Sequence, residues 1–198
     1  MQDHSTVRTC CRALFLGVAI AATPAAPALA GPSHGNGPGR WRWLADTYWI
    51  VPPANLPAVV FDAASARVAP ISDQTVYHIN GYREGYFWGK NVTQIGTAAP
   101  SCSSLVGSVT PEGRVLLSFT TTGSDGAVSQ QQGFGEMVEQ RGQWTMLNQT
   151  SSANFAHWAY MVESAPGDAS WHSLPGVGLS VTAFLAQCPG DGAQSIGR

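Results

Sequence analysis

The residues best suited to chemistry lie in one short stretch, 77–90, where histidine, acid and tyrosine side chains alternate with glycine. His78, Tyr82 and Glu84 fall within it, and His157 occurs much later in the chain. A histidine beside a carboxylate and tyrosine hydroxyls can act as a general acid or base, because its pKa lies near neutrality. Either histidine could instead be a hydrogen-bonded structural residue in the core or on the surface. The sequence leaves both readings open.

The dipeptide Asn80-Gly81 predicts a tight hairpin turn inside this stretch. Glu84 would then lie at or near the turn, and His78 and Trp88 would lie on the flanking strands. His157 would lie on the last strand and could face His78 across the interior of a barrel.

Familiar catalytic signatures do not occur in the chain. It has no His-Glu-x-x-His zinc motif, no Gly-x-Ser-x-Gly nucleophile motif and no dinucleotide-binding glycine pattern. No Cys-x-x-Cys or His-x-His pair suggests a metal site either. We therefore expect no metal and no cofactor, and an enzyme on this chain would depend on side-chain acid–base chemistry alone.

Aromatic residues are the candidates for a ligand-binding wall. Four of the seven tryptophans fall on four different predicted strands, and large rings with one polar atom line apolar or aromatic ligand cavities well. The alternative for any single tryptophan is ordinary packing. The candidate ligand-binding residues are Trp49, Tyr77, Trp88, Trp144, Trp158 and Tyr160.

Composition sets limits on the class of protein. The formal net charge is −2, and charged residues make up only 11% of the chain, against roughly 25% in an average domain. Nucleic-acid binding requires a concentrated basic face, which this balance does not supply. A chain poor in charge and rich in indole has the material for a large apolar interior.

The N-terminus has the three parts of an export signal. Arg8 and Arg12 precede an apolar run over residues 13–22, and Ala28-Leu29-Ala30 supplies the small residues that a signal peptidase accepts. The run is too short to span a bilayer, which needs about 20 apolar residues. The sequence therefore predicts a cleaved signal over 1–30, no integral membrane segment after cleavage, and a periplasmic or extracellular location.

Cleavage would leave two cysteines, Cys102 and Cys188, in an oxidising compartment where thiols pair. A disulfide between them is expected, and two unpaired buried thiols are the alternative.

Between a flexible leader at 31–40 and a flexible tail at 190–198, short β-type segments alternate with turns at close intervals. Residues 54–74 are expected to form a long connection with a helical turn near 63–67, and Ser180 is expected to cap a helix over 181–187. Sizeable side chains on both faces of the last strands favour a closed barrel over a two-layer sandwich. The eight predicted strands cover residues 47–51, 75–79, 86–96, 104–109, 114–121, 133–139, 143–150 and 155–163.

This layout over residues 41–189 resembles the lipocalin and calycin barrels. The shared features are eight sequential antiparallel strands, a tryptophan (Trp49) in the first strand, a long loop after it and a helix after the eighth. Many lipocalins tie the C-terminal segment to the fourth strand, and Cys102 and Cys188 match that arrangement. The first strand lacks the typical glycine before Trp49, and no arginine lies near the last strand. The resemblance implies an all-β, up-and-down, eight-stranded barrel with a short C-terminal helix.

Three functions fit these features. The first is an exported protein that binds a small hydrophobic or aromatic molecule inside the barrel. The second is an isomerase, cyclase or lyase on the same barrel that uses a histidine as acid or base. The third is an envelope interaction protein with a filled barrel. The sequence does not indicate an oligomeric state.

Overall fold

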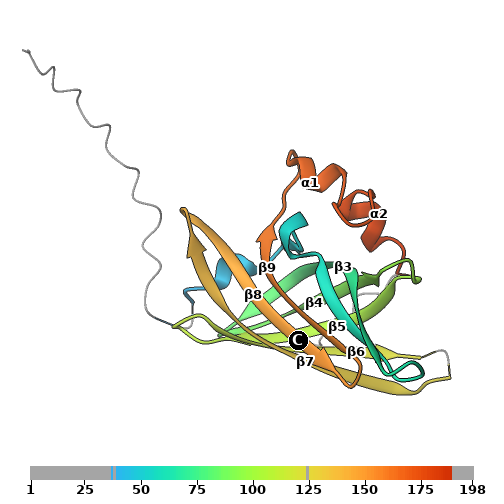
Figure 1. Cartoon of the computed structure of the whole chain (residues 1–198). Coiled ribbons are helices and arrows are strands. Elements are labelled where there is room, and N and C mark those ends of the chain that lie inside the picture. The colour runs from blue at the N-terminus through green and yellow to red at the C-terminus, as the bar shows by residue number, and fades with distance from the viewer. Residues whose placement is uncertain (1–36, 38, 124, 189–198) are drawn as a thin grey trace, which may run out of the picture. The chain divides into compact units, whose positions relative to one another are not determined.

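A computed structural model describes residues 37, 39–123 and 125–188 of the chain, and the remaining residues are not described. The predicted signal (1–30), most of the predicted leader and the predicted tail (190–198) lie outside the described residues. The expected all-β class is confirmed: a closed antiparallel barrel joins strands in chain order, and short helices follow the last strand (Figure 1). The strands are β1 (Thr47–Ile50), β2 (Pro57–Asp62), β3 (Arg67–Arg83), β4 (Tyr86–Ile95), β5 (Ser101–Val109), β6 (Arg114–Thr122), β7 (Val128–Gln140), β8 (Gln143–Ser152) and β9 (Phe155–Glu163).

Two short strands, β1 and β2, together take the place of the first strand of the barrel. Both β1 and β2 pair with β3 on one side and with β9 on the other, so together they fill the place of one strand in an eight-stranded barrel. Pro52 and Pro53 interrupt the strand because proline cannot donate to a ladder. The chain makes one 3₁₀ turn, η2 (Pro53–Asn55), and then resumes as β2.

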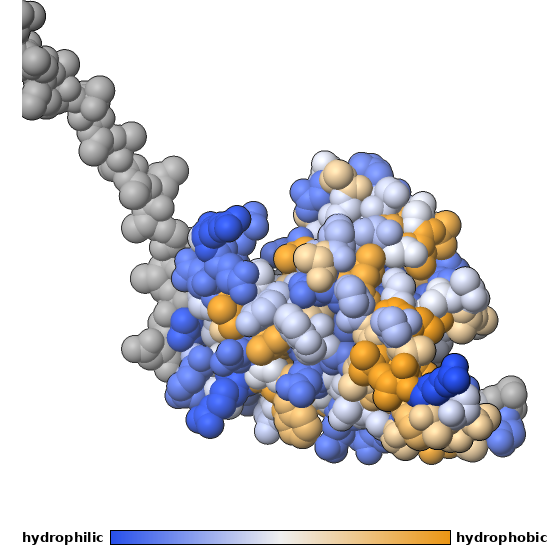
Figure 2. Space-filling model, in the orientation of Figure 1, coloured by the Kyte–Doolittle hydropathy of each residue, from blue (hydrophilic) through white to orange (hydrophobic). Residues whose placement is uncertain are grey.

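The expectation of a long connection over 54–74 with a helical turn is therefore wrong. Residues 63–66 form a turn between β2 and β3, in which the Asp62 carboxylate accepts hydrogen bonds from the Ala64 amide and the Ser65 hydroxyl. β3 begins at Arg67, eight residues before the predicted start, because pairing with β2 extends it. Outward-facing apolar side chains gather over this hairpin in Figure 2, and its exposed apolar residues are Val59, Phe61 and Val68.

The hairpin turn is also displaced from its predicted place. Asn80-Gly81 lies within β3 at a shift in register, and the turn is formed by Glu84 and Gly85, both with positive φ. This register buries Phe87 and lays the Trp88 indole over Gly81, where any side chain would overlap the ring. Packing of these two rings outweighs the local preference of Asn-Gly for a turn.

Side chains alternate along the strands, and the inward-facing ones form an apolar core toward one end of the barrel. We call this the closed end; it holds the β3–β4, β5–β6 and β7–β8 turns. A 3₁₀ turn, η1 (Arg42–Leu44), covers it: Leu44 and the adjacent Trp41 are buried. The Trp41 indole nitrogen donates to the Thr110 carbonyl at 2.8 Å. The Arg40 guanidinium lies over the Trp41 ring, 4.7 Å from its centroid.

The C-terminal helices pack against the outside of the barrel wall (Figure 1). α1 (Ala169–His172) and α2 (Val181–Leu185) follow β9, and the Ser180 hydroxyl caps α2 as expected by accepting from the Ala183 amide. Phe184 and Val181 pack on outward side chains such as Val76. None of the helices in the described residues is long and apolar enough to cross a membrane.

The expected disulfide is present in the fold. Cys102 on β5 is bonded to Cys188 after α2, with 5.8 Å between the Cα atoms. The bond fixes the helical segment to the wall.

Replacing Cys102 and Cys188 together with serine should lower the free energy of unfolding by about 4–5 kcal/mol, because the bond closes a loop with a sequence separation of 86. Urea unfolding of both forms measures the difference, and non-reducing peptide mapping should find the two cysteines linked in the native protein. Equal stability of the two forms, or two free thiols in the native protein, would contradict this prediction.

Candidate functional site

A polar cavity of about 190 Å³ lies in the half of the barrel opposite the closed end. We call it the open-end cavity. Loops at 96–100 and 153–154 lie at this end of the barrel, as do residues 123 and 125–127. Inward-facing residues of six strands and the β8–β9 turn line it: Asp73, Thr75, Tyr77, Asn91, Thr93, Ile95, Phe119, Gln131, Asn148, Thr150, Ser152, Asn154, Phe155 and His157.

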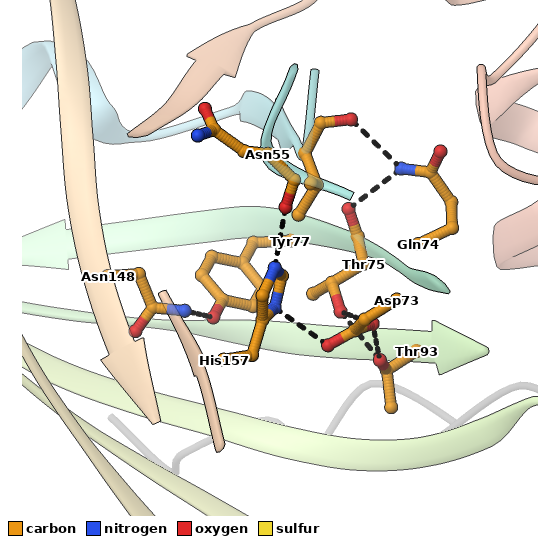
Figure 3. A network of polar contacts seen from close by, with 9 residues as sticks. Asn55, Asp73, Gln74, Thr75, Tyr77, Thr93, Asn148 and His157 are labelled. Carbon is orange, nitrogen blue, oxygen red and sulfur yellow. Dashed lines mark hydrogen bonds and ion pairs between the residues drawn. The ribbon is translucent and has the colours of Figure 1, made fainter. Parts of the chain in front are cut away.

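Asp73 is the centre of a hydrogen-bond network in the wall of this cavity (Figure 3). Its Oδ1 atom accepts from the hydroxyls of Thr75 and Thr93, at 2.8 and 2.7 Å. Its Oδ2 atom lies 2.8 Å from Nδ1 of His157. Thr75 and Thr93 are paired across β3 and β4, and Asp73 precedes Thr75 on the same inward face. The sheet register therefore brings the three oxygen groups together.

His157 uses both ring nitrogens in this network. Nδ1 faces the Asp73 carboxylate, and Nε2 lies 2.7 Å from the backbone carbonyl oxygen of Asn55 in η2. With the Asp73 carboxylate ionised both partners are acceptors, so each ring nitrogen donates a hydrogen and the ring is a cation. The side chains of His157 and Asp73 are only 3% and 5% exposed, so they form a buried ion pair with no net charge.

The protonation of His157 follows from opposing effects. Burial alone lowers the pKa of the imidazole, but the hydrogen bond and the charge of Asp73, helped by the Asn55 carbonyl, outweigh it. The pKa of His157 is consequently raised above its ordinary value.

Tyr77 and Asn148 meet across the barrel interior, from β3 and β8. The Asn148 amide nitrogen donates to the Tyr77 hydroxyl. Burial, and then the charge of Asp73, raise the pKa of Tyr77 well above its ordinary value. The hydroxyl therefore keeps its own proton, which it can donate to another acceptor in the cavity.

Two buried asparagine side chains in the cavity wall have an amide oxygen without a hydrogen-bond partner. They are Oδ1 of Asn148 and Oδ1 of Asn91, whose nitrogen donates to the Ser103 hydroxyl at 2.9 Å. Gly133 on β7 leaves the space next to Asn148 open, because a Cβ atom there would lie 3.0 Å from its Oδ1. A buried amide oxygen costs about 1–3 kcal/mol if no donor reaches it, so a donor that reached either atom would stabilise the folded protein.

Of the six aromatic residues predicted to bind a ligand, only Tyr77 lines the open-end cavity. Trp49 is fully buried in the apolar core and donates to the Thr47 hydroxyl. Trp144 packs edge-on against Trp41 at the closed end. Trp88, Trp158 and Tyr160 face outward, and Trp158 is 56% exposed.

The four predicted acid–base residues are not brought together. His157 lies at the open-end cavity, whereas His78 lies on the outer face of β3, where its ring stacks on Tyr48 with 4.2 Å between centroids. Burial, and then the charge of Lys90, lower the pKa of His78, with Asp46 opposing them. Glu84 occupies the exposed β3–β4 turn, and Tyr82 packs against the core at the closed end.

Sequence reasoning missed Asp73, Thr75, Thr93, Asn91 and Asn148. The sequence offered one signal for this site. Aspartate is uncommon inside a strand, and Asp73 stands two residues before Thr75 and four before Tyr77. Polar residues at this spacing share one face of a strand, and the face proved to be the barrel interior.

Within the described part of the chain, no group of three or more His, Cys, Asp or Glu side chains is arranged to hold a metal ion. Comparison with known proteins finds no matching family model, no matching curated protein and no matching solved structure.

The raised pKa of His157 predicts a pH-dependent stability. In the unfolded chain histidine has a pKa of about 6.5. The stabilisation from the ion pair is complete below that pH, and it is lost as the pH rises through the raised pKa of the folded protein. Urea unfolding between pH 6 and 9 should show this decline in the native protein, with His172→Gln on the exposed part of α1 as a control that keeps it.

His157→Gln should abolish that decline and lower stability by about 3–5 kcal/mol, because Asp73 stays buried without its partner. The double substitution Asp73→Asn with His157→Gln should recover part of the loss. An unchanged pH dependence in His157→Gln would contradict the assignment.

Proposed function

We propose that this protein binds a small, uncharged molecule in the open-end cavity, with polar groups directed at the asparagine amides and an apolar part against aromatic rings. The observation that carries the proposal is the pair of buried amide oxygens, on Asn91 and Asn148, that have no hydrogen-bond partner. A ligand N–H or O–H would satisfy them, and the Tyr77 hydroxyl would donate to a ligand acceptor.

The apolar part of the ligand would contact Phe119 and Phe155, which also line the cavity. Phe119 packs beside Tyr77, with 5.6 Å between ring centroids. The proposed ligand thus has the hydrophobic or aromatic part that the sequence predicts, together with a polar end. Because the Asp73–His157 pair is neutral as a whole, it provides no net charge to attract an ion.

Binding is favoured over acid–base catalysis by the state of His157. Both ring nitrogens are held by acceptors, so the ring has no free lone pair to take a proton and would have to break a bond to η2 or Asp73 to give one up. A filled-barrel interaction protein is the third possibility, and a cavity lined by polar groups argues for a ligand instead.

We further propose that the protein is a lipocalin-like carrier that acts outside the reducing cytoplasm, in the periplasm or beyond the cell. The support is the order of its strands, the helices after the last strand and the Cys102–Cys188 disulfide. Disulfides of this kind persist in oxidising compartments.

Benzamide and N,N-dimethylbenzamide test the polar end of the ligand, because they share an aromatic ring and a carbonyl but only benzamide has N–H donors. Benzamide should shift the NMR signals of the Asn91 and Asn148 side-chain amides and bind at least about 5-fold more tightly than the dimethyl compound, the equivalent of one net hydrogen bond. Asn148→Leu should remove that preference.

Gln149→Leu is the matched control, since Gln149 is adjacent in sequence but exposed on the outer face. It should bind as the native protein does. Equal binding of both compounds, or no shift of the two amides with any amide ligand, would refute the proposed recognition. A native mass spectrum of the protein as purified identifies a ligand that remains bound.

A further inference from the structure

A second hollow, of about 500 Å³, lies at the closed end, away from the open-end cavity. Two indole rings and two carboxylates line it, from Trp43, Trp144, Glu163 and Asp168. We call it the tryptophan cleft. Gly142, Gln143, Val162 and Ala165 complete its wall.

The two indoles are held in place by the core behind them. Trp144 packs edge-on against Trp41, at 4.9 Å between centroids, and Trp43 packs between Trp41 and Trp49, at 6.1 Å from each. Both are partly exposed, so part of each ring is accessible from the cleft. Arg40 already lies over the Trp144 ring, 5.7 Å from its centroid, which shows that a cation is accommodated at this cluster. Arg40 is not among the residues that line the cleft.

The carboxylates add negative charge next to these rings. In the part of the chain that the structure describes, neither Glu163 nor Asp168 has a basic side chain within ion-pair distance. Asp168 accepts a hydrogen bond from the Ala165 amide, which fixes its carboxylate beside the cleft. The pKa of Glu163 is raised, first by burial and then by the charge of Asp168. A cation between the two would relieve this repulsion.

We propose that the tryptophan cleft binds a compact organic cation, an alkylated ammonium group, with the indoles against its methyl groups and Glu163 and Asp168 as counter-charges. Indole is the best of the protein rings for holding a cation, and an alkylated ammonium is weakly hydrated enough to leave water for an aromatic wall. The same cleft would bind a neutral molecule of equal shape less well, because it would leave the two carboxylates without a counter-charge.

Choline and its neutral isostere 3,3-dimethyl-1-butanol test the proposal, because they differ in charge at nearly constant shape. Titration of the purified protein with choline should shift the NMR signals of the Trp43 and Trp144 indole N–H groups. The isostere should bind at least about 5-fold more weakly, the upper end of the range for an exposed cation–π contact. Equal binding of the two compounds, or no response to choline, would overturn the proposal.

Two charge-neutralising variants locate the site. Glu163→Gln and Asp168→Asn should each weaken choline binding several-fold, and asparagine at 168 can still accept from the Ala165 amide. Glu136→Gln, an exposed residue on the outer face of β7, is the control and should leave binding unchanged. Choline binding that persists in the double variant Glu163→Gln with Asp168→Asn would overturn the assignment. Asn148→Leu should not affect choline binding, so this inference and the proposed function can fail separately.

Discussion

Closure of this barrel depends on a charged hydrogen-bonded link at a place where the backbone ladder is interrupted. β9 pairs with β1 only through Val162 and Glu163, and with β2 only through Phe155 and Ala156. Between these points the chain leaves the wall at Pro52 and Pro53 and makes the η2 turn. His157 spans the gap, because its two nitrogens bind the Asn55 carbonyl of η2 and the Asp73 carboxylate of β3.

That link determines the chemistry of the open-end cavity. Burying two charges is costly unless they are paired and their remaining hydrogen-bonding groups are satisfied. Thr75 and Thr93 satisfy the other oxygen of Asp73, and Asn55 satisfies the other nitrogen of His157. The pair is thereby neutral and fully hydrogen-bonded, and the other polar side chains of the cavity wall lie around it.

The interior is consequently divided along its length into two parts of different polarity. Toward the closed end the inward positions hold apolar groups such as Phe87, Leu105 and Met146, and η1 covers them. Toward the open end the same alternation places threonine, asparagine and aspartate inside. The boundary lies at the Tyr77–Asn148 contact, where a phenol ring packs against the core and its hydroxyl faces the polar side. The tryptophan cleft lies outside this interior, at the end that the core seals.

The sequence by itself determined the β class, the antiparallel succession of eight of the nine strands in the described residues and the pairing of Cys102 with Cys188. These follow from local information: alternation over short segments, turn residues, and the two cysteines that lie outside the predicted signal. Only the tertiary structure decided which polar residues meet. Asp73, Thr93, Asn148 and His157 come from four strands, and their approach depends on barrel closure and on register. A shift of one residue would turn each of them to the outer face. The turn between β3 and β4 could not be placed from the sequence either, because the burial of Phe87 outweighed the turn preference of Asn80-Gly81. The tryptophans could be assigned to strands but not to a side of the wall, because a closed barrel with helices on its outside buries rings on both faces.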